Sequence, residues 1–516
     1  MSNSAANDRV RRRPRAVLRA LAASVLMAAT LAACSAVGPD YRAPEIRMPE
    51  QWREAGPEKA AGDPRDLIQW WKTLGDPTLD RLVERALANN LDMKKAVSRL
   101  EEAKARRGAA GAARAPSVSA SGSASSSRVG ESDDIRESYA LGLDVSWEAD
   151  LFGGLRRARD AAQADYEASI EDLRDVLVSL IAEAATNYVQ LRTGQMRLSA
   201  AENNLKLQTE THELVRLKYE TGLSGGLDLD QATYNLETTR AQIPALRKTC
   251  TEAKNRLAVL MGVYPGELES DLADPGGIPS REAGVVAGVP ADLLRRRPDI
   301  RRAERQLAAE TARVGEAEAD RYPQLSLKGG LTYQALALSG LISPANLVAS
   351  LSTALSWKLF QAGAVAENIK ARTALQEQAL LEYKTVVLGA VEETENAMTA
   401  LARENERRES LAKATRAAGQ AADLAVRQYQ SGLSDFQNVL ETQRSLASFQ
   451  DSLVESQGSM TLNRILLYKA LGGGWSNENL APREPPATVP GSDRSSKDSR
   501  SIHQSASSPA VRNRSR

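Results

Sequence analysis

The sequence predicts a mainly α-helical chain with four β-strands, built as two copies of one structural unit. Three observations lead to this fold class. Phe, Trp and Tyr together make up only 4% of the 516 residues, so closely packed helices are favoured over large globular cores. Two long stretches, 155–220 and 364–430, contain no proline and carry apolar side chains at helical spacing. The third observation is an internal repeat that relates the two halves of the chain.

The composition excludes several classes of function. Lys and Arg number 67 against 66 Asp and Glu, which is not the basic excess of a nucleic-acid-binding protein. With two His and two Cys, the chain cannot supply a His/Cys zinc site or a disulfide framework. The spacing of Ser410 and Lys413 and the pair His212-Glu213 have no supporting motifs. We therefore predict no enzyme activity and no cofactor.

Residues 1–33 have the layout of a secretory signal. A segment with six arginines between positions 9 and 19 precedes an apolar run, 20–33, which is too short to cross a bilayer as a helix. The run leads into Cys34 through Leu-Ala-Ala, and this arrangement resembles a bacterial lipobox. The resemblance implies lipidation of Cys34. Because Ser35 rather than Asp follows, it also implies sorting to the outer membrane.

The internal repeat sets the segment boundaries. Residues 92–116 align with 299–323 at an offset of 207, and residues 219–224 align with 429–434 at an offset of 210. Small loop insertions account for such a drift. The predicted segments are a signal peptide (1–33), an N-terminal segment (34–85), a first repeat (86–262), a connector (263–296), a second repeat (297–473) and a disordered tail (474–516).

Each repeat is predicted to begin with a helix, which two β-strands follow. In the first half these are the Ser- and Ala-rich stretch that starts at 117 and the alternating stretch 139–147, and in the second half they are 325–333 and 347–357. A length of about ten residues suits a tilted transmembrane strand. Four strands cannot close a barrel, and open edges cannot face lipid. We therefore expect three copies to form one twelve-stranded barrel.

The long helical stretches follow the strands. At about 1.5 Å per residue, 155–220 and 364–430 would each be roughly 100 Å long. A Gly-containing turn and a returning helix, 227–262 or 435–472, follow each of them. The connector between the halves is dense in Pro and Gly and is predicted to be irregular. The tail is rich in Ser, Arg and Pro, which favours disorder.

Two motifs carry a family resemblance. Residues 70–80 (WWKTLGDPTLD) and 86–92 (ALANNLD) resemble the N-terminal signature of TolC-like outer-membrane factors of the NodT type. Residues 293–301 (LLRRRPDIR) resemble that family's opening of the second repeat. Together with the duplication and the lipobox, the resemblance covers the chain from about 31 to 473.

The resemblance implies a fold, a function and partners. The fold is a homotrimer whose twelve-stranded outer-membrane β-barrel continues into a periplasmic α-helical barrel, with 34–85 as its equatorial segment. The function is that of a passive outer-membrane exit duct for drugs or other small toxic compounds in a tripartite efflux system. The implied partners are outer-membrane lipid, a periplasmic adaptor (membrane fusion protein) and an inner-membrane transporter of the RND type. No nucleic acid is expected.

The turns at the far ends of the long helices match the family's periplasmic tip, which receives the adaptor. The implied adaptor-binding residues are Tyr219, Gly222, Leu223, Ser224, Tyr429, Gly432, Leu433 and Ser434. Gly permits the positive φ of a tight helix end, and an exposed Leu offers an apolar contact. A purely structural interpretation stays open, with Gly as the C-cap of one helix and Ser as the N-cap of the next.

A polar stripe follows the second turn at helical spacing. It matches positions where the family places constricting residues, and the implied gate consists of Gln437, Asn438, Glu441 and Arg444. Three copies of these side chains near one axis could hold the tip closed and favour cations. The alternative is a solvated helix face with a contact between Glu441 and Arg444.

Two other functions remain open at this point. One is a TolC-like duct for type I protein secretion, because substrate choice depends mainly on the partners. The other is a trimeric, lipid-anchored coiled-coil stalk or adhesin that has no lumen, with the β-segments as a head domain.

Overall fold

The computed structural model describes residues 36–53, 67–128, 135–273, 275–280 and 290–476. The chain divides into two compact units, Met1–Trp475 and Ser476–Arg516, and the fold below is that of the first. The predicted signal peptide (1–33), the lipidation site Cys34 and the predicted disordered tail from residue 477 onward lie outside the described residues.

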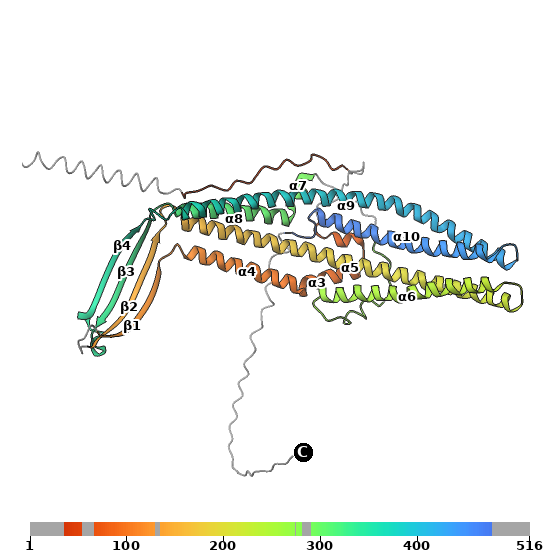
Figure 1. Cartoon of the computed structure of the whole chain (residues 1–516), viewed down its shortest axis with the longest axis horizontal. Helices are drawn as coiled ribbons and strands as arrows, with labels where there is room; N and C mark the ends of the chain where they lie inside the picture. The colour runs from red at the N-terminus through yellow and green to blue at the C-terminus, as the bar shows by residue number, and fades with distance from the viewer. Residues whose placement is uncertain (1–35, 54–66, 129–134, 274, 281–289, 477–516) are drawn as a thin grey trace, which may run out of the picture. The chain divides into compact units, whose positions relative to one another are not determined.

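The two halves of the first unit contain the same elements in the same order (Figure 1). The short helices have 22 residues each, the long helices 67 and the returning helices 35. These matched lengths confirm the predicted duplication. The elements of the first half are α4 (Leu91–Ala112), β1 (Ser117–Arg128), β2 (Ile135–Ala149), α5 (Gly154–Glu220) and α6 (Gly226–Leu260). Those of the second are α8 (Pro298–Ala319), β3 (Gln324–Ala335), β4 (Leu347–Ser356), α9 (Ala364–Gln430) and α10 (Phe436–Ala470), with the 3-10 turns η2 (Leu338–Gly340) and η3 (Pro344–Asn346) between its strands.

A short N-terminal region packs against the middle of the long helices. It contains η1 (Trp70–Leu74) and α3 (Pro77–Asn89). Asp76 begins α3, because its Oδ1 accepts the backbone N–H groups of Thr78 and Leu79. The other carboxylate oxygen accepts the Tyr188 hydroxyl of α5 at 2.7 Å. The N-terminal motif found in the sequence therefore fixes α3 to the long helix.

Equivalent hydrogen bonds fix the short helix of each half. Asn90 precedes α4, and its Nδ2 donates to the carbonyl of Leu260 at the end of α6 (3.0 Å). Arg297 precedes α8, and its Nη1 donates to the carbonyl of Ala470 at the end of α10 (2.9 Å). In both halves a side chain thus satisfies a carbonyl at a helix end, which would otherwise lack a partner.

The four strands form one antiparallel sheet in the order β1-β2-β3-β4. The two predicted hairpins are confirmed, and pairing of β2 with β3 joins the two halves. One face is apolar. On it, Leu143 of β2 lies opposite Ala120 of β1 and Leu331 of β3, which in turn lies opposite Ala349 of β4. Side chains alternate between faces along each strand, so the register places the apolar residues together.

The other face of the sheet is polar. Asp144 of β2 lies opposite Ser119 of β1 and Gly330 of β3, and Gly330 lies opposite Ser350 of β4. Ser121 donates a hydrogen bond to the Asp144 carboxylate at 3.0 Å. In a single chain nothing covers the apolar face: Leu351 of β4, which lies on that face, is exposed. An apolar face of this extent marks an interaction surface.

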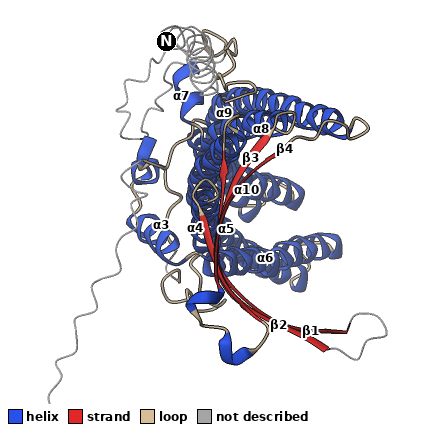
Figure 2. Cartoon of the chain, turned by 90° about the vertical axis from the view of Figure 1, so that its left-hand side faces the viewer, coloured by secondary structure: helices blue, strands red, loops and turns tan. Residues whose placement is uncertain are grey.

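The helices form two long hairpins that start from the sheet. α5 packs against α4, α6, α8 and α10, and α9 packs against α8 and α10. Figure 2 shows the α5–α6 and α9–α10 hairpins nearly end-on. The buried residues in the central part of α5 are mostly small or aliphatic, as the composition predicts. Within the described residues, no helix is both long and apolar enough to cross a membrane.

One prediction for the connector is wrong in detail. Its last part forms a helix, α7 (Pro290–Arg296), rather than irregular structure. Proline is well tolerated in the first turn of a helix, and the Leu and Arg residues that follow are good helix formers. Leu294 is buried, so packing stabilises this helix. The many Pro and Gly residues just before α7 favour irregular structure, so the sequence pattern did not indicate this helix.

Candidate functional site

Both helical hairpins end in the same tight turn. Gly222 and Gly432 have φ values of 72° and 73°, in the left-handed region that favours glycine. The N–H of Leu223 donates to the carbonyl of Lys218 (2.7 Å), and the N–H of Leu433 donates to that of Gln428 (2.9 Å). The glycine N–H groups donate to the carbonyls of the two tyrosines of the motif (3.0 and 3.2 Å). These are Schellman motifs, which satisfy the last carbonyls of α5 and α9.

The turns leave one leucine of each half in solvent. Leu223 is 78% exposed and Leu433 is 81% exposed. A Cβ atom at Gly222 or Gly432 would meet no other atom within 4 Å. The turn surface is therefore open in the described chain, and its two leucines are available for an apolar contact with a partner.

The two tyrosines of the motif differ, although the sequence makes them equivalent. Tyr219 is 47% exposed, whereas Tyr429 is 6% exposed. Tyr429 packs against Phe436 in a cluster with Val215 of α5 and Val439 of α10. Burial raises the pKa of Tyr429 above its ordinary value. Tyr429 therefore holds the two hairpins together, and only Tyr219 offers a surface.

Lys218 supplies a contact that the sequence analysis missed. Its Nζ donates to the Tyr429 carbonyl at 2.7 Å and lies 3.9 Å from the centroid of the Tyr429 ring. A cation is favourable both at a helix C-terminus and over an aromatic face. The position adjoins the motif, but the equivalent residue of the second half is Gln428. The internal repeat therefore did not indicate the contact from Lys218 to Tyr429.

The serines of the motif do not cap the returning helices. The N-cap residues of α6 and α10 are Gly225 and Asp435. Ser224 instead donates to the Asp228 carboxylate at 2.6 Å, and Ser434 accepts the Nδ2 of Asn438 at 2.9 Å. The N-cap interpretation of these serines is wrong, because one further residue separates each serine from its helix. Each serine ties the turn to the first turn of the helix that follows.

The four predicted gate residues form one exposed stripe on α10. Gln437, Asn438, Glu441 and Arg444 are all exposed. On the opposite side, Phe436, Val439 and Leu440 are buried in the cluster shared with α5, and this packing fixes the direction of the stripe. Within the described residues, no ion pair joins Glu441 to Arg444.

Two polar contacts hold α10 to α5, one beside the stripe and one farther along the helix. Arg197 binds Asp451 through two hydrogen bonds of 2.7 and 2.9 Å, and Gln443 donates to the Thr211 hydroxyl at 2.8 Å. A bidentate pairing of this kind restricts orientation as well as distance. Sequence spacing gave no signal for either contact, because the partners are more than 230 positions apart.

The arrangement supports binding and lining of a passage. The turns offer exposed leucines beside hydroxyl groups, and the α10 stripe offers amide, carboxylate and guanidinium groups. Such groups make non-covalent contacts with a partner and set the polarity of a passage.

The sequence matches the family described as "Outer membrane efflux protein" over residues 82–263 and 289–473. Nodulation protein T of Rhizobium leguminosarum bv. viciae is 31% identical over 90% of this chain and 95% of its own length. The antibiotic efflux pump outer membrane protein ArpC of Pseudomonas putida is 30% identical over 89% of this chain and 96% of its own.

Solved structures agree with these relatives. The outer-membrane channel OprN superposes with a TM-score of 0.80 and 37% identity, over 85% of this chain and 99% of its own. CusC superposes with a TM-score of 0.75 and 27% identity, over 85% of this chain and all of its own. The duplicated helical hairpins and the four-stranded sheet thus form the fold of the TolC-like channels, and this chain belongs to the outer membrane efflux protein family.

Proposed function

We propose that three copies of this chain form the outer-membrane exit duct of a tripartite efflux system. The observation that carries the proposal is the two-faced sheet that continues into helices of 67 residues. An apolar face suits lipid and a polar face suits water, so one sheet separates the two. Helices of roughly 100 Å then extend the passage away from the membrane.

The edges of the sheet support assembly. Within the described chain, β1 and β4 each pair on one side only. Unpaired backbone groups are not tolerated in lipid, so each edge requires another strand. Pairing of β4 with β1 of the next copy supplies it, and three copies give twelve strands.

The helix turns are the proposed contact with a periplasmic adaptor. Exposed Leu223 and Leu433 lie at the ends of the two hairpins of one chain. Two similar turns per chain give six in a trimer, which suits a partner that binds in repeated copies. The further partner is an inner-membrane transporter of the RND type, which would supply the energy.

The stripe of Gln437, Asn438, Glu441 and Arg444 is the proposed gate. In the trimer it would face the axis, where three carboxylates and three guanidinium groups could pair between copies. The proposed cargo consists of small organic molecules, because the relatives' names refer to antibiotics, toluene and pyoverdine. These names favour efflux over the protein-secretion alternative.

Bilayer conductance tests the proposal directly. The purified protein in a planar bilayer should give discrete channel openings, and deletion of its gene should raise sensitivity to small toxic compounds. A lumenless stalk would give no openings, and this outcome would contradict the proposal. Lipidation of Cys34 remains a separate prediction, to be checked by mass spectrometry of the mature N-terminal peptide.

A further inference from the structure

The N-terminal segment crosses the second half of the molecule as a strap. We use this name for residues 43–48, which run beside α7, α8 and α9 (Figure 1). Before the strap, Tyr41 donates to the Glu304 carboxylate of α8 at 3.1 Å. After it, the backbone N–H of Arg53 donates to the Glu395 carboxylate of α9 at 3.0 Å. Between these two points no hydrogen bond within the described residues holds the strap, so its position depends on side-chain packing.

Alternate residues of the strap are covered differently. Pro44, Ile46 and Met48 are half-buried, whereas Glu45 and Arg47 are exposed. An extended chain presents every second side chain to the same side. The three apolar residues therefore share the side of the strap that faces the helices.

A cavity of about 500 Å³ lies between the strap and the helices. Its apolar lining includes Leu294 of α7, Ile300 of α8 and Val387 of α9, all of which are buried. Ile46 and Met48 of the strap complete this lining. Sites for small molecules are typically cavities of roughly 300–1,000 Å³ with mostly apolar walls and a few polar groups. The space therefore suits a small organic ligand.

Three hydrogen-bond donors also line the cavity: Arg47 of the strap, Arg295 of α7 and Tyr383 of α9. Within the described residues neither arginine forms an ion pair, and the Tyr383 hydroxyl makes no hydrogen bond. Burial and the nearby Glu304 carboxylate raise the pKa of Tyr383, so its hydroxyl stays protonated. Among the described lining residues, Glu45 alone carries a carboxylate, so the lining has a net positive charge.

Donors without acceptors, together with aliphatic walls, suit an amphipathic anion. Guanidinium groups bind carboxylates through charge-assisted hydrogen bonds, and a neutral phenol adds a further donor. The aliphatic side chains favour the hydrocarbon part of the same ligand, because its burial removes apolar surface from water. A neutral apolar molecule would leave the arginines without a partner, and an inorganic anion would leave the apolar walls uncovered.

We propose that this cavity binds a free fatty acid, whose carboxylate meets the two arginines and whose hydrocarbon chain lies beneath the strap. Tyr383 lies 19 positions after Ala364, the first residue of α9, and so roughly 30 Å along the helix from its end at the sheet. Half of a bilayer's hydrocarbon core is only about 15 Å thick. The choice of a free ligand over a bilayer lipid rests on the proposed function, which places the sheet in the membrane.

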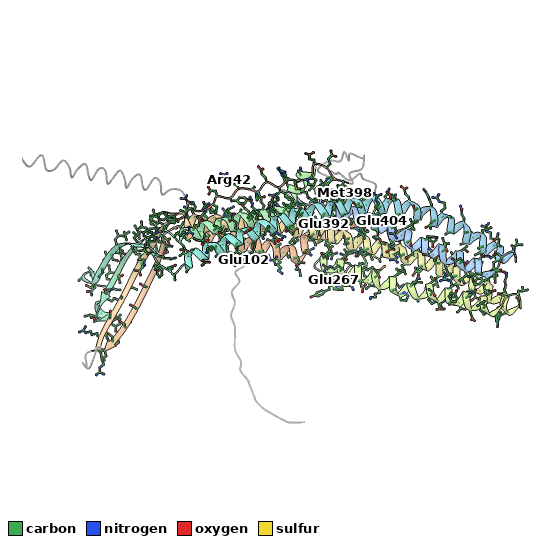
Figure 3. All side chains as sticks on the ribbon, turned by 45° about the horizontal axis from the view of Figure 1, so that its top comes forward. Arg42, Glu102, Glu267, Glu392, Met398 and Glu404 are labelled. Carbon is green, nitrogen blue, oxygen red and sulfur yellow. The ribbon has the colours of Figure 1, made fainter. Side chains whose placement is uncertain are left out.

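Octanoate binding tests the proposal. Equilibrium dialysis of radiolabelled octanoate against the purified protein in a neutral detergent should show one saturable site per chain. Arg295→Gln removes one charge from the lining and should weaken binding roughly tenfold or more. Ile46→Trp fills the cavity from the strap and should abolish saturable binding. The matched control is Arg42→Gln, which should bind as the wild type does, because Arg42, labelled in Figure 3, is exposed just before the strap and does not line the cavity.

Amide hydrogen exchange locates the bound octanoate. A ligand that joins the strap to α7 and α9 should slow exchange over residues 45–53 in the wild type and not in Ile46→Trp. Octanol has the same chain without the carboxylate and should bind more weakly than octanoate. Octanoate uptake that is equal in the wild type and Ile46→Trp would reflect the detergent alone and would overturn the site.

Two further measurements separate the sources of the ligand and the two proposals. In phosphatidylcholine nanodiscs, octanoate binding should be unchanged when phosphatidylglycerol is added; its loss would assign the cavity to a bilayer lipid and overturn the free fatty acid. Planar-bilayer conductance is measured on the same preparations. Channels without an octanoate site would overturn this inference alone. Octanoate binding by protein that gives no channels would overturn the proposed function and leave the cavity as a binding site.

Discussion

Lys218 of α5 binds Tyr429 of α9 twice, through the Tyr429 carbonyl at 2.7 Å and through the face of its ring at 3.9 Å from the centroid. The contact joins the ends of the two long helices within one chain. It occurs once, because Gln428 takes the equivalent position in the second half. The two turns of each chain therefore differ: Lys218 before the first turn binds Tyr429 before the second, and no equivalent contact runs the other way.

Removing this contact should loosen the second turn. Lys218→Met keeps the aliphatic stem and removes the charge, so it removes the hydrogen bond and the cation–π contact. Together these are worth about 1 kcal/mol, which corresponds to roughly a fivefold increase in local opening. Amide hydrogen exchange over 429–436 measures it. Lys206→Met, at an exposed position of the same helix, is the control and should leave exchange there unchanged.

The gate residues predict a change in conductance. Glu441 and Arg444 have no ion pair with each other in the described chain, and the proposed gate pairs them between copies instead. Glu441→Ala with Arg444→Ala should raise single-channel conductance in planar bilayers, because the constriction loses both size and charge. The control changes Lys248 and Glu252 to Ala, an exposed pair on α6. Unchanged conductance in the gate variant would refute the assignment.

Much of this fold follows from the sequence because the determining signals are local. Gly222 and Gly432 mark their turns since only glycine adopts a φ near 70° without strain, and the alternation in 139–147 marks β2. The repeat then predicts both halves from either one. The contacts that connect the two halves join residues far apart in the sequence. The pairing of β2 with β3 and the contact from Lys218 to Tyr429 depend on tertiary packing.

The candidate site shows the same limit. The sequence assigns Tyr219 and Tyr429 one role, because each lies in the same motif. Packing separates them, since Phe436 covers Tyr429 whereas the equivalent residue of the first half is Gly226, which has no side chain to cover Tyr219. Tyr429 is therefore buried within its own chain, and Tyr219 is the tyrosine of the motif that a partner can reach. The binding roles of the turn and the gate remain predictions.

The second turn should distinguish docking from assembly. Gly432→Arg adds a large charged side chain where the structure leaves open space, at a cost in backbone strain of roughly 1–2 kcal/mol. It should abolish cross-linking to the periplasmic adaptor and leave trimers intact. Gly432→Ala carries the same strain without the bulk and should retain cross-linking. Cross-linking that survives in the arginine variant means that the adaptor binds elsewhere.

The contacts around Arg297 predict a dependence of stability on pH. Burial alone would raise the pKa of Asp299. Two hydrogen bonds from Arg297 (3.1 and 2.7 Å) and one from the N–H of Ile300 lower it by more, so the pKa lies below its ordinary value. A lowered pKa stabilises the fold above the unfolded value of about 3.9, and this stabilisation is lost as the pH falls through the folded value. Asp299→Asn should therefore destabilise the protein by about 1–3 kcal/mol at pH 7. The gap between variant and wild type should be smaller at pH 3 than at pH 7.

Denaturant unfolding at the two pH values measures this effect, and the duplication supplies its control. Asp92 is equivalent to Asp299, is exposed, and forms no ion pair within the described residues. Asp92→Asn should change stability by less than about 0.5 kcal/mol at either pH, because a surface substitution away from a charged network has little effect. A gap for Asp299→Asn that is equally large at pH 7 and pH 3 would show that its loss of stability comes from packing and not from the ionised carboxylate.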